Sequence, residues 1–69
     1  MQTIKLYEAP QKIKINLEAS DGSKHIIFHR IDGMYSFCTT EKGAPVHLYA
    51  NAELVKKDDG SYDAVKGTY

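Results

Sequence analysis

The longest regular pattern in the chain is the alternation of hydrophobic and polar residues from Lys12 to Ala19. Isoleucine, leucine and alanine occupy the odd positions, and lysine, asparagine and glutamate occupy the even ones. A period of two places successive side chains on opposite faces of an extended backbone. Residues 12–19 are therefore predicted to form a strand with one apolar face.

Glycine-containing turn signals divide the rest of the chain into short segments. These signals are Asp21-Gly22, Asp32-Gly33, Lys42-Gly43 and Asp58-Asp59-Gly60. The first three stand about ten residues apart, which is the spacing of short strands joined by turns. Asp-Gly is favoured in type I′ hairpin turns, whose two central residues both need a positive φ. The pattern predicts an antiparallel meander.

Two further segments before residue 32 have the character of strands. Residues 3–8 place Ile4 and Leu6 on one face, and this strand is expected to end at Pro10, which has no N–H to give to a ladder. Residues 24–31 contain three consecutive apolar side chains, which indicates a strand with both faces apolar near its middle, either a central strand or a strand in a curled sheet.

Residues 34–40 and 61–66 are also predicted to be strands. In 34–40, Tyr35, Phe37 and Thr39 lie on one face, and Met34, Ser36, Cys38 and Thr40 lie on the other. Residues 46–57 are ambiguous. Their alternating apolar positions fit one long strand, but residues 50–57 would also make two turns of helix. We predict strand as far as Ala50 and leave strand and short helix open beyond it.

The expected fold class is all-β, with one short helix near residues 50–57 as the alternative. The chain has 69 residues, which is enough for one domain covering residues 1–69 and too few for two full sheets. Five or six antiparallel strands in this length are expected to curl into a small half-open barrel of SH3-like or OB-like type, because curling limits exposed edges.

Charge and cysteine content narrow the classes of function. Nine Lys and Arg residues balance nine Asp and Glu residues, and the isoelectric point is about 6.8. This balance argues against strong electrostatic binding to nucleic acid, because such binding normally requires an excess of basic residues. The single cysteine, Cys38, cannot form an internal disulfide, and no apolar run suits a signal peptide or a membrane span. We therefore expect a cytoplasmic protein that does not enter membranes.

No residue set in the sequence indicates catalysis or a metal site. On a strand, His25 and His29 would lie about 13 Å apart, too far to share a metal ion easily. His47 would complete such a site only if its strand paired beside that of the other two. Cys38 lacks an electropositive neighbour in the sequence and is expected to pack in the core. We expect no enzyme activity, no metal and no cofactor.

Exposed tyrosines are the most informative candidates for binding. Tyr7 and Tyr49 occupy positions opposite the apolar alternation, and Tyr35 shares a strand face with Phe37. Tyrosines beside a few basic groups form protein-binding hot spots, because they offer a large rigid area at a small entropic cost. The predicted binding residues are Tyr7, Lys12, Lys14, Arg30, Tyr35, His47 and Tyr49.

The leading hypothesis is a small protein-binding module, an inhibitor or accessory subunit, that acts through this tyrosine-bearing face or through an exposed strand edge. Edge pairing would also allow a homodimer. A second hypothesis is a barrel that binds single-stranded nucleic acid, with Tyr35, Phe37 and Tyr49 stacking on bases and Lys12, Lys14 and Arg30 contacting phosphates. A third is a binder of a small molecule or nucleotide at a site between subunits.

Overall fold

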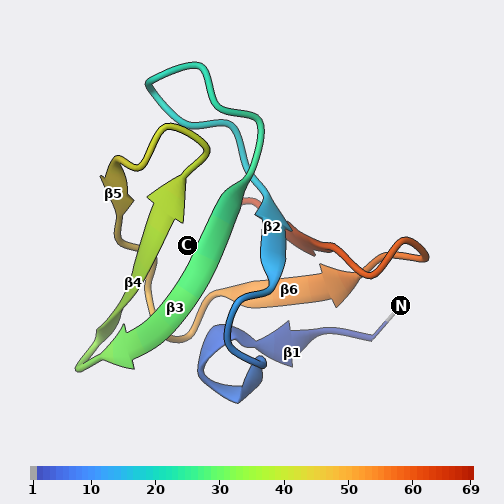
Figure 1. Ribbon diagram of the computed structural model, residues 1–69. Coiled ribbons are helices and arrows are strands. Elements are labelled where there is room, and N and C mark those ends of the chain that lie inside the picture. The colour runs from blue at the N-terminus through green and yellow to red at the C-terminus, as the bar shows by residue number, and fades with distance from the viewer. Residues whose placement is uncertain (1) are drawn as a thin grey trace.

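A computed structural model describes residues 2–69, which form a single curled sheet with almost no helix (Figure 1). The strands of this part of the chain are β1 (Ile4–Lys5), β2 (Lys14–Asn16), β3 (Ile26–Asp32), β4 (Tyr35–Thr40), β5 (Pro45–Val46), β6 (Glu53–Lys56) and β7 (Tyr62–Ala64). One short 3-10 helix, η1 (Leu6–Glu8), follows β1. The all-β class predicted from the sequence is confirmed.

The order of the strands is β1-β6-β7-β2-β3-β4-β5. All neighbours are antiparallel except β2 and β7, which are parallel, with Ile15 beside Tyr62 and Asn16 beside Asp63. The prediction of five or six strands in a purely antiparallel meander is therefore wrong: β2 to β5 follow it, but the last strand enters the middle of the sheet. The Asn16 side-chain amide donates to Ser61 Oγ and Asp63 Oδ1, both at 2.9 Å, and so fastens this parallel junction.

The sheet folds over its own core without closing into a barrel. In Figure 1, β3 and β4 form a long tilted hairpin on the left, and β6 and β1 run across at the lower right. β1 and β5 are the two edges of the sheet. The chain between β5 and β6 spans the gap, because Ser36 N–H donates to Leu48 O at 2.8 Å and Leu6 N–H donates to Ala52 O at 2.8 Å.

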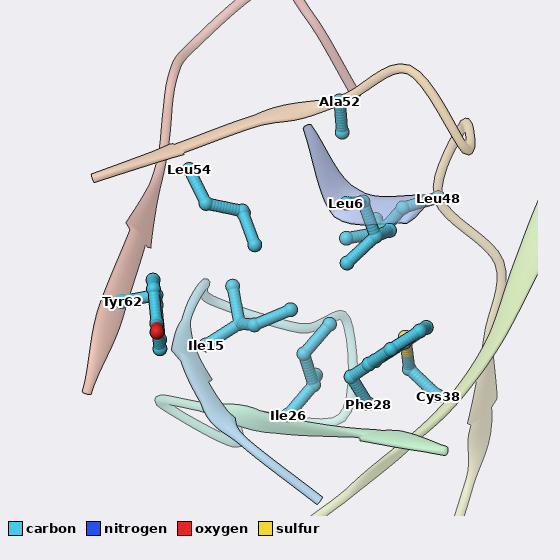
Figure 2. Packing of buried hydrophobic residues seen from close by; sticks show 9 residues of the cluster. All are labelled: Leu6, Ile15, Ile26, Phe28, Cys38, Leu48, Ala52, Leu54 and Tyr62. Carbon is cyan, nitrogen blue, oxygen red and sulfur yellow. The ribbon is translucent and has the colours of Figure 1, made fainter. Parts of the chain in front are cut away.

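The core lies inside this curl, where side chains from both ends of the sheet converge (Figure 2). Leu54 and Tyr62 lie on one side, and Ile26, Phe28 and Cys38 lie on the other. The buried hydrophobic residues are Leu6, Ile15, Ile26, Phe28, Cys38, Leu48, Ala52, Leu54 and Tyr62. Burial of Cys38 confirms its predicted place in the core.

The predicted strand at 12–19 is reduced to the three residues of β2. Its apolar face points inward as expected, but Ile15 alone is fully buried, while Ile13 and Leu17 pack partly against the core. A bulge interrupts the ladder at its start. Lys12 N–H donates to Phe28 O at 2.7 Å, and Phe28 N–H donates to Ile13 O at 3.1 Å. Two residues before β2, Lys12 and Ile13, therefore lie opposite the single residue Phe28.

Lys12 has a φ of 71°, and no other non-glycine residue between 2 and 69 has a positive φ. The left-handed conformation costs a residue with a Cβ about 1–2 kcal/mol, and glycine avoids this cost but loses more entropy on folding. Lys12→Gly is therefore expected to raise the free energy of unfolding by about 0.5–1 kcal/mol. Urea unfolding followed by circular dichroism measures the gain. Lys12→Ala, which keeps the Cβ, is the control and should give no gain; equal effects of the two variants would contradict the explanation.

The turns form where the sequence predicted them but not as type I′ turns. One hydrogen-bond pattern is shared by the three turns at residues 19–23, 40–44 and 57–61. The N–H of the first residue donates to the carbonyl of the fifth, and the glycine N–H donates to the carbonyl of the first. The glycines have φ values between 86° and 90°, and the residues before them do not have a positive φ. These are type I turns followed by a glycine bulge. At the tip of the β3–β4 hairpin Gly33 alone has a positive φ, 66°, which fits a type II′ turn.

One other predicted segment needs correction, and for a second the structure decides between the two alternatives that the sequence left open. The strand predicted at 3–8 ends after Lys5, because the chain turns into η1, where Glu8 Oε1 accepts the Lys5 N–H at 3.0 Å. Residues 50–57 are not a helix. They contain a turn and then β6, whose backbone pairs on both sides, with β1 and with β7. This double pairing outweighs the helix propensity of the segment.

Candidate functional site

The outward face of β3, β4 and β5 carries the aromatic side chains predicted to bind. β4 alternates as predicted, with Ser36, Cys38 and Thr40 buried and Tyr35, Phe37 and Thr39 facing out. Met34 is the exception: β4 begins after it, so it lies in the turn and is exposed rather than on the inward face. The outward face of β4 is bordered by β3 on one side and by residues 45–49 on the other.

Tyr35 and Tyr49 form a stacked pair across the edge of the sheet. An isolated antiparallel bridge joins the two residues, and their ring centroids are 5.1 Å apart with planes inclined by 24°. The neighbouring Tyr49 side chain raises the pKa of the Tyr35 phenol, mainly by hydrogen bonding and secondly by its charge. Both side chains are about half exposed, so a partner can reach both members of the stack.

Met34 and Tyr7 come to the same end of the sheet from two other segments. Ala50 N–H donates to Met34 O at 2.9 Å, and Tyr7 N–H donates to Ala50 O at 3.1 Å. One residue thus links the hairpin tip, the end of the β5–β6 connection and η1. The exposed fractions are 74% for Met34, 55% for Tyr7, 48% for Tyr49 and 45% for Tyr35. We name these four residues the tyrosine end.

A second group adjoins the tyrosine end along β4, and Phe37 is at its centre. The Arg30 guanidinium carbon lies 4.9 Å from the centre of the Phe37 ring, which is a cation–π distance. The rings of His29 and His47 flank Phe37 at centroid distances of 5.4 Å and 6.1 Å. We name His29, Arg30, Phe37 and His47 the Phe37 row.

A β-bulge at His29 produces this row. Phe28 pairs with Cys38 and Arg30 pairs with Phe37, so His29 is an extra residue in β3. Without it Arg30 would share the inward face of Phe28, because residues two apart lie on one face of a strand. The bulge turns Arg30 outward, and His29 is held beside it by Thr39, whose Oγ1 lies 2.8 Å from His29 Nε2.

His47 is oriented by an irregularity in the β4–β5 ladder. Its Nδ1 lies 3.0 Å from the Ser36 carbonyl oxygen, and since a carbonyl only accepts, Nδ1 carries the proton. The Leu48 N–H donates instead to the buried Ser36 hydroxyl at 3.2 Å. At this point a side-chain acceptor replaces the main-chain acceptor of a regular ladder, and the strand predicted from Val46 to Ala50 accordingly ends at Val46.

Lys12 and Lys14 are not part of the tyrosine end. Lys14 pairs with Ile27 and belongs to the outward side of β2, and Lys12 lies at the bulge opposite Phe28. Strand β3 lies between β2 and β4, the strand that carries Tyr35. The seven residues predicted to bind therefore divide into Tyr7, Tyr35 and Tyr49 at one end, Arg30 and His47 in the Phe37 row, and the two lysines on the far side of β3.

The other titratable groups weighed in the sequence lie away from this face. His25 Nδ1 is 3.4 Å from Glu41 Oε1. Burial raises the pKa of the Cys38 thiol, which opposes formation of the reactive thiolate. Between residues 2 and 69 no three His, Cys, Asp or Glu side chains gather as metal ligands, and the same residues enclose no pocket.

Asp21 organises the loops at the opposite end of the β3–β4 hairpin. Its carboxylate accepts the Thr40 hydroxyl at 2.7 Å and the Ser23 N–H at 2.9 Å. These hydrogen bonds, with the Thr40 hydroxyl first, lower the pKa of Asp21 from 3.8 to about 2. The two loops 19–23 and 40–44 are thereby tied together, as their closeness at the top of Figure 1 shows.

The lowered pKa predicts a component of acid unfolding. The unfolded chain binds a proton at Asp21 near pH 3.8 and the folded chain only near pH 2, so stability is lost as the pH falls through this interval. Asp21→Asn is expected to be less stable than the parent at neutral pH, and the difference should shrink from about pH 4 to about pH 2. Urea unfolding across this pH range measures it. Asp58→Asn in the loop 57–61 is the control; a constant difference for Asp21→Asn would contradict the assignment.

The sequence missed one member of the tyrosine end and one of the Phe37 row. Strict alternation over 34–40 places Met34 on the same face as Cys38, whereas β4 begins one residue later. The bulge that brings His29 beside Phe37 leaves no pattern in a single sequence. Phe37 itself was named only as a stacking candidate for nucleic acid.

Comparison with known protein families, curated proteins and solved structures found no match to this chain. Within residues 2–69, no helix has the length and apolar character to cross a membrane.

Proposed function

We propose that the chain is a protein-binding module that recognises its partner through the tyrosine end. The observation that carries this proposal is the gathering of Tyr7, Met34, Tyr35 and Tyr49 from three separate segments around Ala50. Exposed apolar side chains scattered singly are ordinary, but a contiguous group marks an interaction site. Tyrosine and methionine are also enriched at the centres of protein interfaces.

The charges beside the tyrosine end define the chemistry of the partner. Arg30 from the Phe37 row and Lys14 further along are the cations of the outward face, and Asp32 beside Tyr35 is the nearby carboxylate. Glu8 follows Tyr7 in η1, where its carboxylate accepts the Lys5 N–H, and the other acidic residues lie in loops and in β6 and β7. The partner is a protein segment with large apolar side chains for the tyrosine end and carboxylates for Arg30, since complementary charges guide and orient association.

The arrangement favours a protein partner over single-stranded nucleic acid. Bases bind by stacking on open aromatic faces. Tyr35 and Tyr49 already stack on each other, and Arg30 covers the ring of Phe37. The balanced charge of the chain offers little counterion release.

Side-chain recognition is also favoured over addition of a strand to the sheet edge. β5 has two residues, and its Pro45 has no N–H to offer a partner strand. β1 is equally short. Short edges and proline are features that discourage edge pairing. The curl of the sheet supports the SH3-like or OB-like arrangement as part of this proposal, in which the molecule acts as an inhibitor or accessory subunit in the cytoplasm.

Selection from a random peptide library displayed on phage tests the proposal. The immobilised protein is expected to enrich peptides that combine Trp, Phe or Leu with Asp or Glu. The double variant Tyr35→Ala, Tyr49→Ala is expected to enrich none of them. Tyr69→Ala is the matched control, because Tyr69 is an exposed tyrosine outside the tyrosine end, and it should select the same peptides as the parent.

Two outcomes would overturn the proposal. The first is enrichment of the same peptides by the double variant, which would place the binding surface elsewhere. The second is the absence of any enriched peptide together with tight binding of single-stranded oligonucleotides that weakens steeply with salt. That result would favour the nucleic-acid hypothesis and make Arg30 and Lys14 phosphate contacts.

A further inference from the structure

The chain contains three Asp-Gly steps, at residues 21–22, 32–33 and 59–60. An aspartate followed by glycine has a known chemical liability, because the glycine amide nitrogen can attack the aspartate side-chain carboxyl carbon. Glycine has no Cβ to hinder this approach. The reaction needs a carboxyl group and an amide nitrogen that are both free to move toward each other.

Two of the three steps are held in place by hydrogen bonds on both reacting groups. Asp21 accepts hydrogen bonds from Thr40 and Ser23, and the Gly22 N–H donates to Ala19 O at 3.1 Å. Asp59 accepts from the Ser61 N–H at 2.9 Å and from the Ser61 hydroxyl at 2.6 Å. The Gly60 N–H donates to Lys57 O at 3.0 Å.

The step from Asp32 to Gly33 lacks these restraints. Asp32 is the exposed last residue of β3, and Gly33 begins the two-residue turn. Among residues 2–69 no hydrogen bond engages the Asp32 carboxylate or the Gly33 N–H. A Cβ built on Gly33 would meet no atom within 4 Å. The two reacting groups therefore lie in open space at the tip of the hairpin.

We propose that Asp32 is a site of spontaneous isoaspartate formation. The Gly33 nitrogen attacks the carbon of the protonated Asp32 carboxyl group, a C–N bond forms as the C–OH bond breaks, and the hydroxyl leaves with the nitrogen's proton as water. Water then opens the resulting five-membered imide at either carbonyl. Opening at the main-chain carbonyl routes the backbone through the former side chain, so the product has the same mass as the starting chain and needs no reactant other than water.

The product changes the geometry of the hairpin tip. It adds a methylene to the backbone next to a turn in which Asp32 pairs with Tyr35 and Met34 is fully in the turn. A two-residue turn fixes the register of its strands, so an extra backbone atom displaces Met34 and Tyr35. This inference rests on the hydrogen bonds of the three steps alone and does not depend on what the tyrosine end binds.

Incubation of the folded protein at physiological temperature and neutral pH for several weeks tests the proposal. Proteolytic peptides are then separated by chromatography, and isoaspartate is marked with isoaspartyl methyltransferase and labelled methyl donor. The peptide that contains residues 32–33 is expected to accumulate label several-fold faster than those that contain 21–22 or 59–60. In concentrated urea, where the hydrogen bonds are lost, the three steps should react at similar rates.

A variant separates this mechanism from general damage. Asp32→Glu would need a six-membered imide, which forms much more slowly, and is expected to lose the label at this position. Its fold is checked by circular dichroism, and the outward position of residue 32 makes the longer side chain easy to accommodate. Label at 21–22 or 59–60 that equals or exceeds the label at 32–33 in the folded protein would overturn the proposal.

Discussion

Replacing Ile15 by alanine is expected to lower the free energy of unfolding by about 2–5 kcal/mol. Ile15 is fully buried and lies in β2, which pairs with β3 on one side and with β7 on the other. β2 thus joins the two halves of the sheet. Domains have about 0.05–0.15 kcal/mol of stability per residue, so for a chain of 69 residues this loss is a large part of the total. A substantial fraction of the variant should be unfolded at room temperature.

Urea unfolding, followed by circular dichroism or by tyrosine fluorescence, measures this loss. Ile27→Ala is the matched control, because Ile27 is one strand away and only half-buried on the outward side of β3. It should cost much less than Ile15→Ala. Similar losses at the two positions would show that the inside of the curl is not the main source of stability.

The double variant Tyr35→Ala, Tyr49→Ala is expected to weaken binding of the tightest selected peptide by at least 2 kcal/mol, or about 30-fold. Each tyrosine contributes a rigid ring, and removal of both also removes their stacking. Fluorescence anisotropy with the labelled peptide measures the change. Both side chains are half exposed, so the variant should keep the fold, which thermal unfolding verifies.

Two companion variants sharpen this second test. Tyr35→Phe keeps the ring and removes the hydroxyl, so a small loss would assign the affinity to the apolar surface. Arg30→Gln is expected to weaken binding at low salt and to reduce the salt dependence, because it removes the proposed partner of an acidic residue. Unchanged affinity in the double tyrosine variant would contradict the proposed site.

Local patterns in the sequence were sufficient for some parts of the fold. The alternation in 34–40 correctly separated the inward Ser36 and Cys38 from the outward Tyr35 and Phe37, because a strand has a fixed period. The four glycine signals located the turns at 19–23, 32–35, 40–44 and 57–61, but the turns after η1 and before β6 contain no glycine and were not located by these signals. β3 lies inside the sheet, as expected from its run of apolar residues, although Ile27 on its outward side is only half-buried.

Other parts depend on contacts between distant residues. The parallel pairing of β2 with β7 rests on Ile15 meeting Tyr62 and on the side-chain bonds of Asn16. No periodicity within either segment indicates this partner. β6 is a strand because neighbours on both sides complete its hydrogen bonds, a tertiary effect that outweighs local helix propensity.

Part of the candidate site could also be predicted from local patterns, and part of it depends on contacts between distant residues. The positions of Tyr7 and Tyr49 opposite the apolar alternation, and of Tyr35 on the face opposite Cys38, predict their exposure, which the structure shows. Their approach to one another depends on the backbone bonds of Ala50, which a single sequence does not reveal. The Phe37 row depends on one inserted residue in β3, and strict alternation would have turned Arg30 inward.

The position of β7 in the middle of the sheet has a consequence for the order of folding. Residues 14–16 remain without one neighbour until residues 62–64 have been synthesised, so the core cannot close before β7 is available. Contacts between segments so far apart also require closure of a long loop, which slows folding relative to proteins built from local hairpins. The β3–β4 hairpin pairs two strands that follow each other in the chain, so it can form first during synthesis. A nascent chain that ends before β7 would expose Ile15 and Ile26, which makes it a natural substrate for chaperones and proteases.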